Sequence, residues 1–425
     1  MNIKKFLLNE KNIERDSYFW NMLGSLLSAF QSVIMLMILT RTVGLIEAGI
    51  FTIAFANANL FMTIGKYGMR NFQVSDVRDQ FSFQEYKASR ILSSAAMIAV
   101  SVGYTFYTAY TNNYTPEKIW VIIWMCLFKL IDAIEDVYHG MYQRQNRLDI
   151  ASKALTLRMA ITIVIFACGL IFLKNLLWSL IIATITTTFL FILFTKWTID
   201  IFDIRKQAKK IDRKNLIILM KICFPLFAGS FLSFYIGNAP KYAIDATLTD
   251  ALQACYGFIS MPVFIIGLLN NFIFNPMLFQ MSVLWKEQKI KQFVQKTLIQ
   301  SGIVAFITVI CIAGAWLLGI PVLSWLYNTD LAPYKTELLI LLLGGGFLGL
   351  SGLLNAVITI IRYQKSLMWG YVVVALLAFL FSDRIVAQYE MMGAAVLYTI
   401  LMGLLCLIFA ALFFIGIRKS IRRSI

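Results

Sequence analysis

Residues 177–199 read LWSLIIATITTTFLFILFTKWTI, and residues 200–214, which follow directly, read DIFDIRKQAKKIDRK. The first stretch is mainly apolar over the ~20 residues that an α-helix needs to cross the hydrocarbon core of a membrane. The second stretch is rich in lysine and arginine, which mark the cytoplasmic end of a spanning helix. Together they predict a transmembrane helix that ends in a basic cytoplasmic loop near the middle of the chain.

The same apolar pattern occurs on both sides of this loop. Runs of mainly apolar residues between charge clusters predict about twelve spanning helices, six before the loop and six after it. The first six are residues 17–40, 45–66, 88–110, 118–140, 154–173 and 177–199. The second six are residues 215–238, 252–276, 294–318, 337–360, 367–384 and 393–417. We therefore predict an all-α polytopic membrane protein.

The composition excludes a soluble protein. Of the 425 residues, 60% are hydrophobic and 14% are charged, against roughly 25% charged in ordinary soluble domains. The mean hydropathy is +0.75. The core of a soluble protein of this size could not bury so many apolar residues. Twelve membrane-spanning helices of ~20 residues each would accommodate nearly all of them.

The placement of the basic residues predicts the orientation. The net charge is +16, which in a soluble chain would suggest a nucleic-acid partner. With both termini in the cytoplasm, nearly all of the 38 lysines and arginines fall in cytoplasmic segments. The six in outer segments are Arg41, Lys118, Lys174, Lys241, Lys335 and Arg384. Topology and the anionic inner leaflet of a bacterial cytoplasmic membrane account for the charge, so no nucleic-acid partner is expected.

The two sides of the basic loop show self-similarity. Residues 24–28, GSLLS, in the first expected helix recur as residues 229–233, GSFLS, in the seventh. Six helices per half give both halves the same orientation in the membrane, as in transporters built from parallel repeats. We expect a pseudo-symmetric pair of six-helix lobes, residues 1–200 and 215–425, joined by a basic cytoplasmic linker at 201–214.

Small polar and amide side chains recur inside the expected spans of both halves. Lipid cannot satisfy their hydrogen bonds, so they face protein or water. One interpretation is helix packing through small residues, and the other is the lining of a shared cavity, where amides suit a hydroxyl-rich ligand. These candidate cavity residues are Asn21, Ser25, Ser28, Asn57, Ser230, Ser233, Asn270 and Asn271.

The fourth expected span carries several ionisable residues. Residues 129–136 read KLIDAIED, and Lys129 lies near the middle of the membrane. Lys129, Asp132 and Asp136 share one helix face. A central charge costs at least ~2.5–3.5 kcal/mol, so these groups pair or face water. Two interpretations follow: an ion pair that locks two helices, or an inward-facing site where Lys129 attracts an anionic substrate and Asp132 or Asp136 carries a proton or sodium ion.

Other charged residues lie near the ends of the expected spans. Arg41 and Lys241 lie at outer ends, whereas Lys66, Arg70 and Arg158 lie at inner ends. We expect most of these side chains to act as anchors that extend toward the membrane surface.

No set of residues predicts catalysis, a cofactor or a bound metal. The expected loops are too short to hold a domain, and the sequence has no phosphate-binding loop or metal-ligand cluster. The six cysteines fall singly in apolar runs. The one histidine, His139, falls at a helix end, where a satisfied polar residue is expected. We therefore expect a protein that is not an enzyme.

The first hairpin and two later segments carry motifs that we recognise. The chain reads YFWNMLG at 18–24, LTRTVG at 39–44 and AGIF at 48–51. These motifs, with residues 129–149 and 240–257, resemble the polysaccharide flippases, the oligosaccharide exporters of the multidrug/oligosaccharidyl-lipid/polysaccharide (MOP) superfamily. The resemblance covers the whole chain in length, number of spans and six-plus-six layout.

The resemblance implies a transporter that moves undecaprenyl-diphosphate-linked oligosaccharide repeat units from the inner to the outer leaflet, for capsule, O-antigen or exopolysaccharide assembly. Such proteins work by alternating access of two lobes around a central cationic cavity. In that scheme Lys129, Arg41 and Lys241 would receive the diphosphate or acidic sugars. Asp132 and Asp136 would couple transport to a proton or sodium ion. The implied partners are the lipid-linked oligosaccharide, membrane lipids and the glycan polymerase machinery.

Two other functions stay open on the sequence. A multidrug/cation antiporter of the same superfamily would hold one or two acidic residues in an apolar pocket, so the central Lys129 argues against it. A membrane glycan polymerase or glycosyltransferase would need a large outer loop with catalytic carboxylates or arginines. The longest expected outer loop, 319–336, offers only Asp330 and Lys335.

Overall fold

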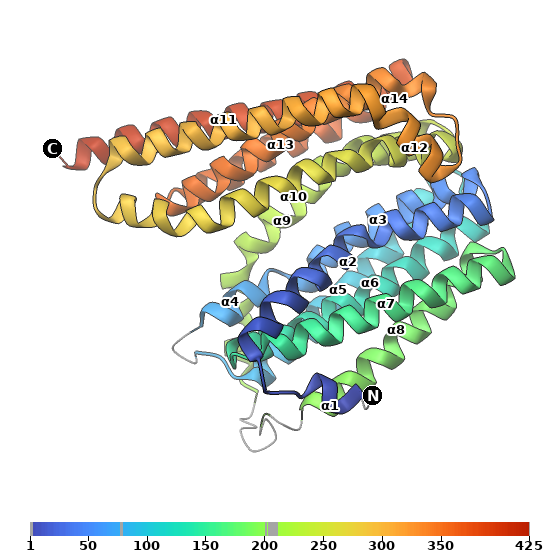
Figure 1. The fold of residues 1–425 in the computed structure, drawn as a ribbon, viewed down its shortest axis with the longest axis horizontal. Helices are drawn as coiled ribbons and strands as arrows, with labels where there is room; N and C mark the ends of the chain where they lie inside the picture. Colours follow the sequence, from blue (N-terminus) through green and yellow to red (C-terminus); the bar gives the residue numbers. More distant parts are fainter. Residues whose placement is uncertain (1–2, 77–79, 200–201, 203–210, 425) are drawn as a thin grey trace. The chain divides into compact units, whose positions relative to one another are not determined.

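The described part of the chain is built from helices joined by short turns (Figure 1). The computed structural model describes residues 3–76, 80–199, 202 and 211–424, without the side chains of residues 268–273, 275, 276, 279, 364, 365 and 420–424. The first helices are α1 (Ile3–Leu7), α2 (Ile13–Thr42), α3 (Leu45–Lys66), α4 (Met69–Ser75), α5 (Phe83–Thr111), α6 (Pro116–Arg144), α7 (Leu148–Leu173) and α8 (Leu176–Ile199). They are followed by α9 (Arg213–Thr247), α10 (Asp250–Lys286), α11 (Ile290–Gly314), the π-helix η1 (Ala315–Gly319), α12 (Ile320–Tyr327), the 3-10 helix η2 (Ala332–Tyr334), α13 (Lys335–Ile360) and α14 (Gln364–Ser424).

Local sequence decides where several helices begin. Ser82 and Glu85 form a capping box at the start of α5, in which each side chain accepts a hydrogen bond from the other residue's backbone N–H. Thr115 caps α6, and Pro116 takes the first helical position, where no backbone N–H is needed. Thr249 caps α10 in the same way as Thr115 caps α6.

The helices have the length and composition of membrane spans. Among the described residues, ten helical segments are long and apolar enough to cross a membrane. α6 is outside this set because charged residues interrupt its apolar run. α14 counts as one segment, although it contains the two predicted spans 367–384 and 393–417. Glu390, at φ 50° and ψ −131°, breaks the helical geometry of α14 between these two spans. The prediction of an all-α polytopic membrane protein is confirmed, whereas the count of twelve and the cytoplasmic termini stay predictions.

The chain forms two compact units, Met1–Phe231 (unit 1) and Leu232–Ile425 (unit 2). α9 contributes residues to both units, so one helix carries the chain from the first to the second. Most of the predicted linker 201–214 lies outside the described residues. The predicted lobe boundaries at 200 and 215 therefore stay a prediction.

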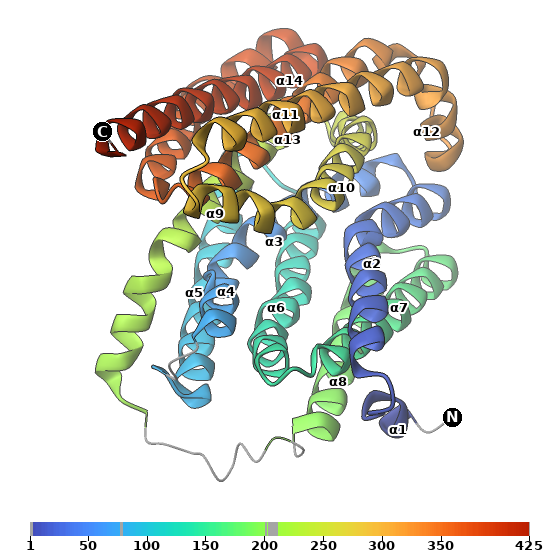
Figure 2. The ribbon, with the colours of Figure 1, turned by 60° about the vertical axis from the view of Figure 1, so that its left-hand side comes forward.

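Within unit 1, α6 is an inner helix. It packs against α3, α5, α7 and α8, and these helices run alongside one another in both ribbon views (Figures 1 and 2). Val121 and Met125 of α6 are fully buried, and so is Tyr86 of α5. The short α1 packs on α7 and α8, where the fully buried Leu7 contacts an apolar cluster that includes Phe194. The inner position of α6 places its ionisable residues away from lipid.

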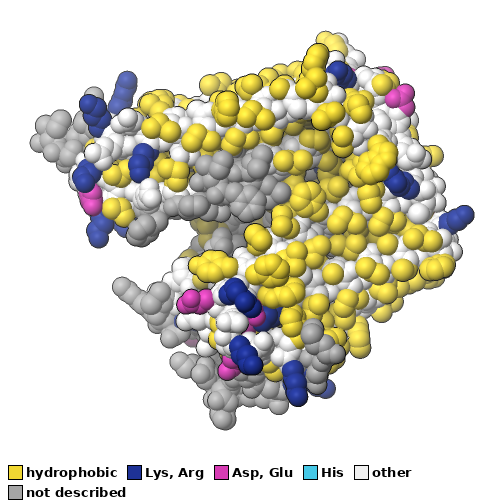
Figure 3. Space-filling view, in the orientation of Figure 1, with side chains coloured by type: hydrophobic (Ala, Val, Ile, Leu, Met, Phe, Trp, Pro, Cys, Tyr) yellow, Lys and Arg dark blue, Asp and Glu magenta, His cyan; other side chains and the backbone are white. Residues whose placement is uncertain are grey.

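The surface fits a lipid environment. On the face drawn in Figure 3, hydrophobic side chains cover the middle parts of the helices, while lysine and arginine gather toward helix ends. Phe172, Phe189 and Phe379 are among the large apolar side chains that are exposed. Apolar cover with basic ends is the pattern that a bilayer selects.

Glycines bring α13 close to its neighbours in unit 2. A Cβ atom at Gly344 would lie 2.6 Å from the ring of Tyr398 in α14, and one at Gly346 would lie 2.5 Å from Cγ2 of Thr308 in α11. Both distances are shorter than any Cβ contact that a protein tolerates without movement. Small residues therefore set how closely these helices approach, as is common between membrane helices.

We expect Gly344→Val to destabilise unit 2 by about 1–3 kcal/mol, because the added methyl groups push α13 away from Tyr398. Gly352→Val is the matched control, because Gly352 lies on the same helix and a Cβ atom added there would meet none of the described atoms within 4 Å. Thermal unfolding of the detergent-solubilised protein measures the difference. Equal unfolding midpoints for the two variants would contradict the close packing at Gly344.

Candidate functional site

The charged residues Lys129, Glu135 and Asp136 of α6 are buried inside unit 1, and Asp132 beside them is half-buried. Lys129 is 4% exposed, Glu135 is 5% exposed and Asp136 is 9% exposed. Taking a charged side chain out of water costs several kcal/mol, unless partners of opposite charge and hydrogen bonds compensate. The partners of these residues therefore define the site.

Lys129 is held by one carboxylate, one amide and an aromatic ring. Its Nζ donates to Oδ2 of Asp132 at 3.1 Å, and to Oε1 of Gln31 in α2 at 2.7 Å. The same atom lies 4.8 Å from the ring centroid of Phe55 in α3, which adds a cation–π contact. The ion pair of Lys129 thus lies within α6, and only its hydrogen bond to Gln31 reaches α2. The role of Lys129 in substrate binding stays a prediction.

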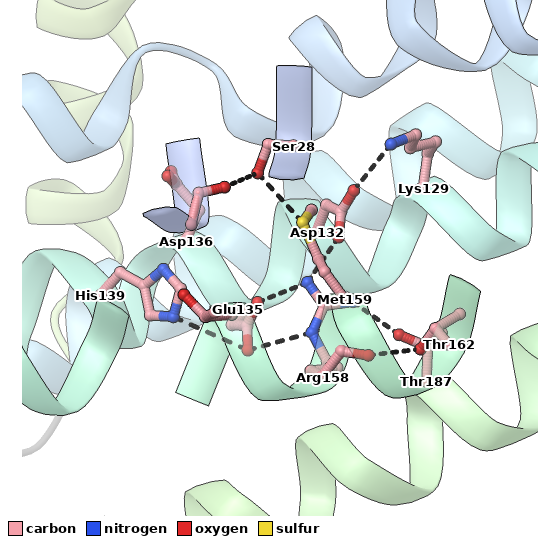
Figure 4. Close-up of polar contacts among 12 residues, drawn as sticks. Ser28, Lys129, Asp132, Glu135, Asp136, His139, Arg158, Met159, Thr162 and Thr187 are labelled. Carbon is pink, nitrogen blue, oxygen red and sulfur yellow. Dashed lines mark hydrogen bonds and ion pairs between the residues drawn. The ribbon is translucent and has the colours of Figure 1, made fainter. Parts of the chain in front are cut away.

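Arg158 of α7 lies in the middle of the group that Lys129 joins (Figure 4). Its Nη2 is 2.6 Å from Oδ1 of Asp132 and 2.6 Å from Oε2 of Glu135. Its Nε donates to Oε1 of Glu135 at 3.3 Å, and its Nη1 donates to Oγ1 of Thr187 in α8 at 2.6 Å. At 1% exposure, Arg158 joins α6, α7 and α8. Arg158 is thus not one of the charged residues that extend toward the membrane surface, because two carboxylates of α6 hold it inside unit 1.

Lys129, Asp132, Glu135 and Arg158, here called the charge cluster, form an electrically balanced set. Two positive groups face two negative groups, which lowers the cost of burying all four. His139 lies next to the cluster, with its Nε2 3.7 Å from Oε1 of Glu135. Among the described residues, no group of three or more His, Cys, Asp or Glu side chains is arranged to hold a metal ion.

Asp136 has partners different from those of Asp132. Its Oδ2 accepts from Nη2 of Arg90 in α5 at 2.8 Å, and its Oδ1 lies 3.6 Å from Nη1 of Arg70. Arg90 is fully buried and also donates to the carbonyl oxygen of Gly65 at 2.7 Å. The two aspartates that share a helix face in the sequence are thus tied to different neighbouring helices.

Four partners of the site were not predicted from the sequence: Gln31, Arg90, Glu135 and Arg158. A glutamine in a spanning helix is a polar group that lipid cannot satisfy, so Gln31 carried the same signal as the nearby Ser28. Arg158 was placed at the inner end of an expected span and Arg90 lies close to the start of another, and nothing in the local sequence separates a buried arginine from a surface anchor. Their burial depends on carboxylates that other helices supply.

The predicted polar residues of unit 1 occupy several environments. Asn21 and Ser25 are exposed. Ser28 donates to the carbonyl oxygen of Gly24 at 2.8 Å and lies 3.0 Å from Sδ of Met159, the residue that follows Arg158 in α7 (Figure 4). Asn57 is 1% exposed, and its Oδ1 has no hydrogen-bond partner among the described residues.

The remaining predicted residues do not join the charge cluster. Arg41 is exposed in the last turn of α2, and Ser230 is exposed in α9. Ser233 and Lys241 are half-buried in unit 2, and no hydrogen bond or ion pair engages Lys241 within the described part of the chain. The side chains of Asn270 and Asn271 lie outside the described residues. The roles of all these residues stay predictions.

A second buried ionic group ties the start of α2 to α7. Lys153 is fully buried, with its Nζ 2.7 Å from Oδ2 of Asp16 and 3.6 Å from Oδ2 of Asp149. Asp149 also accepts from Nε of Arg147 at 3.0 Å. Like Asp132, Asp149 is thus a carboxylate held between one lysine and one arginine.

The arrangement of the helices is similar to that of solved transporters. The chain matches the inward-facing structure of a multidrug resistance MATE family transporter of the MOP superfamily with a TM-score of 0.70 and 12% identity, over 93% of this chain and 95% of that chain. It matches the eukaryotic MATE transporter AtDTX14 with a TM-score of 0.64 and 13% identity, over 98% of this chain and all of that chain. The protein is a multi-pass membrane protein with the MATE fold.

The sequence then identifies the family. Residues 15–282, more than half of the chain, match the family described as polysaccharide biosynthesis protein. The capsular polysaccharide biosynthesis protein CapF of Staphylococcus aureus is 24% identical over 383 residues, which cover 89% of this chain and 93% of CapF. The chain belongs to the polysaccharide biosynthesis protein family, which confirms the expected resemblance at the level of this family.

Proposed function

We propose that this protein is a flippase of a bacterial cytoplasmic membrane that moves undecaprenyl-diphosphate-linked oligosaccharide repeat units from the inner to the outer leaflet. The translocated units would enter assembly of capsule, O-antigen or exopolysaccharide, in cooperation with a glycan polymerase. The observation that carries this proposal is the match of residues 15–282 to a polysaccharide biosynthesis family on a chain with the MATE fold. The name of the relative CapF, a capsular polysaccharide biosynthesis protein, supports the glycan class.

The charge cluster supports an anionic substrate. Lys129 carries a positive charge deep in unit 1, and its only charged partner in the cluster is Asp132. A diphosphate is the strongest anion of the proposed substrate, and an ammonium group binds it as a point charge. Arg41 and Lys241 are further candidates for contacts with the diphosphate or with acidic sugars. The two compact units provide the two bodies that alternating access requires.

Asp132 and Asp136 are the proposed residues for coupling to a proton or sodium ion. Each is a carboxylate of α6, an inner helix of unit 1, that is paired with an arginine of another helix. Ionisable residues inside membrane proteins commonly form ion or proton pathways. Arg158 pairs with Asp132, and Arg90 pairs with Asp136. Binding of a proton or sodium ion to either carboxylate would therefore weaken its ion pair with the arginine.

Reconstitution tests the proposed function. The full-length protein is placed in vesicles with a lipid-linked oligosaccharide in one leaflet, and a membrane-impermeant glycosidase reports how much reaches the other leaflet. We expect the protein to accelerate this transfer above the rate in protein-free vesicles. Imposed proton and sodium gradients then identify the coupling ion. Transport of cationic drugs without transfer of the oligosaccharide would reject the flippase and favour a multidrug/cation antiporter.

A further inference from the structure

Asp132 divides its two carboxylate oxygens between two cations. Oδ2 lies 3.1 Å from Nζ of Lys129, and Oδ1 lies 2.6 Å from Nη2 of Arg158. The shorter contact joins two helices, because Arg158 belongs to α7, whereas the longer contact stays within one turn of α6. If Lys129 were to leave, Asp132 would keep its closer partner and would not become an unpaired carboxylate.

Lys129 is at the edge of the charge cluster, whereas Arg158 is in its middle (Figure 4). Arg158 is committed to Asp132, Glu135 and Thr187 through three nitrogen atoms. Lys129 has one charged partner, Asp132, and one neutral polar partner, Gln31. An incoming anion can therefore replace Asp132 at Lys129 without breaking any bond to Arg158.

We propose that Asp132 is an internal competitor for the anionic substrate: it neutralises Lys129 in the empty transporter, and a diphosphate group displaces it from Lys129 during binding. This inference rests on the proposed function and adds a mechanism for release. Arg158 acts as a positioning residue that holds Asp132 close enough to return to Lys129. A transporter needs a substrate bound strongly enough to enter and weakly enough to leave. When Asp132 pairs with Lys129 again, it weakens the binding of the substrate and so allows the substrate to leave. The number of charges on the protein stays the same.

The competition predicts a gain of affinity when the competitor is removed. Asp132→Asn keeps the shape of the side chain, removes the charge that neutralises Lys129, and leaves Arg158 paired with Glu135. Inorganic pyrophosphate is the probe, titrated into the purified full-length protein in lipid nanodiscs. We expect Asp132→Asn to bind pyrophosphate about tenfold more tightly than the wild-type chain, which corresponds to ~1.4 kcal/mol. Lys129→Ala should lose this binding.

Asp149→Asn is the matched control. Asp149 is also held by one lysine and one arginine, although it is fully buried, and its removal changes the net charge of unit 1 by the same amount. We expect its pyrophosphate affinity to equal that of the wild-type chain. Equal gains in Asp132→Asn and Asp149→Asn would overturn the proposal, because the effect would then be one of net charge alone.

Two further measurements keep the outcome decisive. Asp132→Ser removes the same charge with a smaller side chain, and unfolding midpoints identify which of the two variants is folded. Affinity at or below the wild-type value in a folded variant would overturn the internal competitor. Repeating the titration with undecaprenyl diphosphate in the nanodisc separates a lipid-borne from a free diphosphate. Because these experiments measure binding, they can fail while the vesicle assay still shows flipping, and the reverse holds as well.

Discussion

Cells in which Lys129→Ala replaces the wild-type chain are expected to lose surface glycan while they keep a normal amount of the protein in the membrane. The protein should accumulate because Asp132, the charged partner of Lys129, keeps its 2.6 Å contact with Arg158. No carboxylate of the charge cluster is left without a partner, so the large penalty for an unpaired buried charge does not arise. Transport should fail because the anionic group of the proposed substrate would lose the positive charge of Lys129 inside unit 1.

Measuring surface glycan and membrane abundance in the same cells separates these two effects. Lys129→Arg keeps the positive charge and should restore part of the export, although a guanidinium differs in shape and hydrogen bonding from an ammonium group. Normal glycan at normal abundance in Lys129→Ala cells would reject a role of Lys129 in transport. Loss of the protein itself would mean that Lys129 serves the stability of the fold.

Arg158→Leu is expected to have the opposite profile, a loss of stability of about 3–5 kcal/mol that prevents accumulation of the folded protein. Removing the guanidinium leaves Glu135 without its cation and takes from Asp132 the closer of its two partners. It also removes the link from α6 to Thr187 in α8. The midpoint of unfolding of the detergent-solubilised protein, together with its abundance in the membrane, measures the loss.

Two controls test whether the buried charge is the cause. Arg15 is an exposed arginine with 77% of its side chain accessible, so Arg15→Leu should leave the unfolding midpoint unchanged. The double change Arg158→Leu with Glu135→Leu removes the stranded carboxylate as well, while Asp132 keeps Lys129. This double variant should be more stable than Arg158→Leu alone. A wild-type midpoint for Arg158→Leu would show that the charge cluster does not hold α6, α7 and α8 together.

Much of the fold could be predicted because membrane helices are encoded locally. The expected span 45–66 coincides with α3 at both ends, and the expected span 177–199 begins one residue after α8 does. The length of an apolar run and the charges at its ends carry this information within about 20 residues. The position of Lys129 and Asp132 on one helix face followed from the helical repeat in the same way.

The partners of the charged residues could not be predicted in this manner. Glu135 and Arg158 are 23 residues apart, Arg90 and Asp136 are 46 apart, and Gln31 and Lys129 are 98 apart. Each pair joins different helices, and the sequence does not state which helices become neighbours. Arg158 was therefore grouped with charged residues most of which were expected to be surface anchors, although it makes the most hydrogen bonds in the charge cluster.

The sequence alone determined that this chain is a polytopic helical membrane protein, where most of its spans lie, and that α6 carries charges which lipid cannot accept. These properties depend on composition and on spacing along one helix, where each residue acts on near neighbours. The tertiary structure decided that Asp132 faces both Lys129 and Arg158, that Asp136 faces Arg90, and that the buried cations Lys129, Arg158 and Arg90 each lie against a carboxylate. Pairing of charges is a property of packed helices, because a counter-charge acts over a few ångströms in space regardless of its distance along the chain.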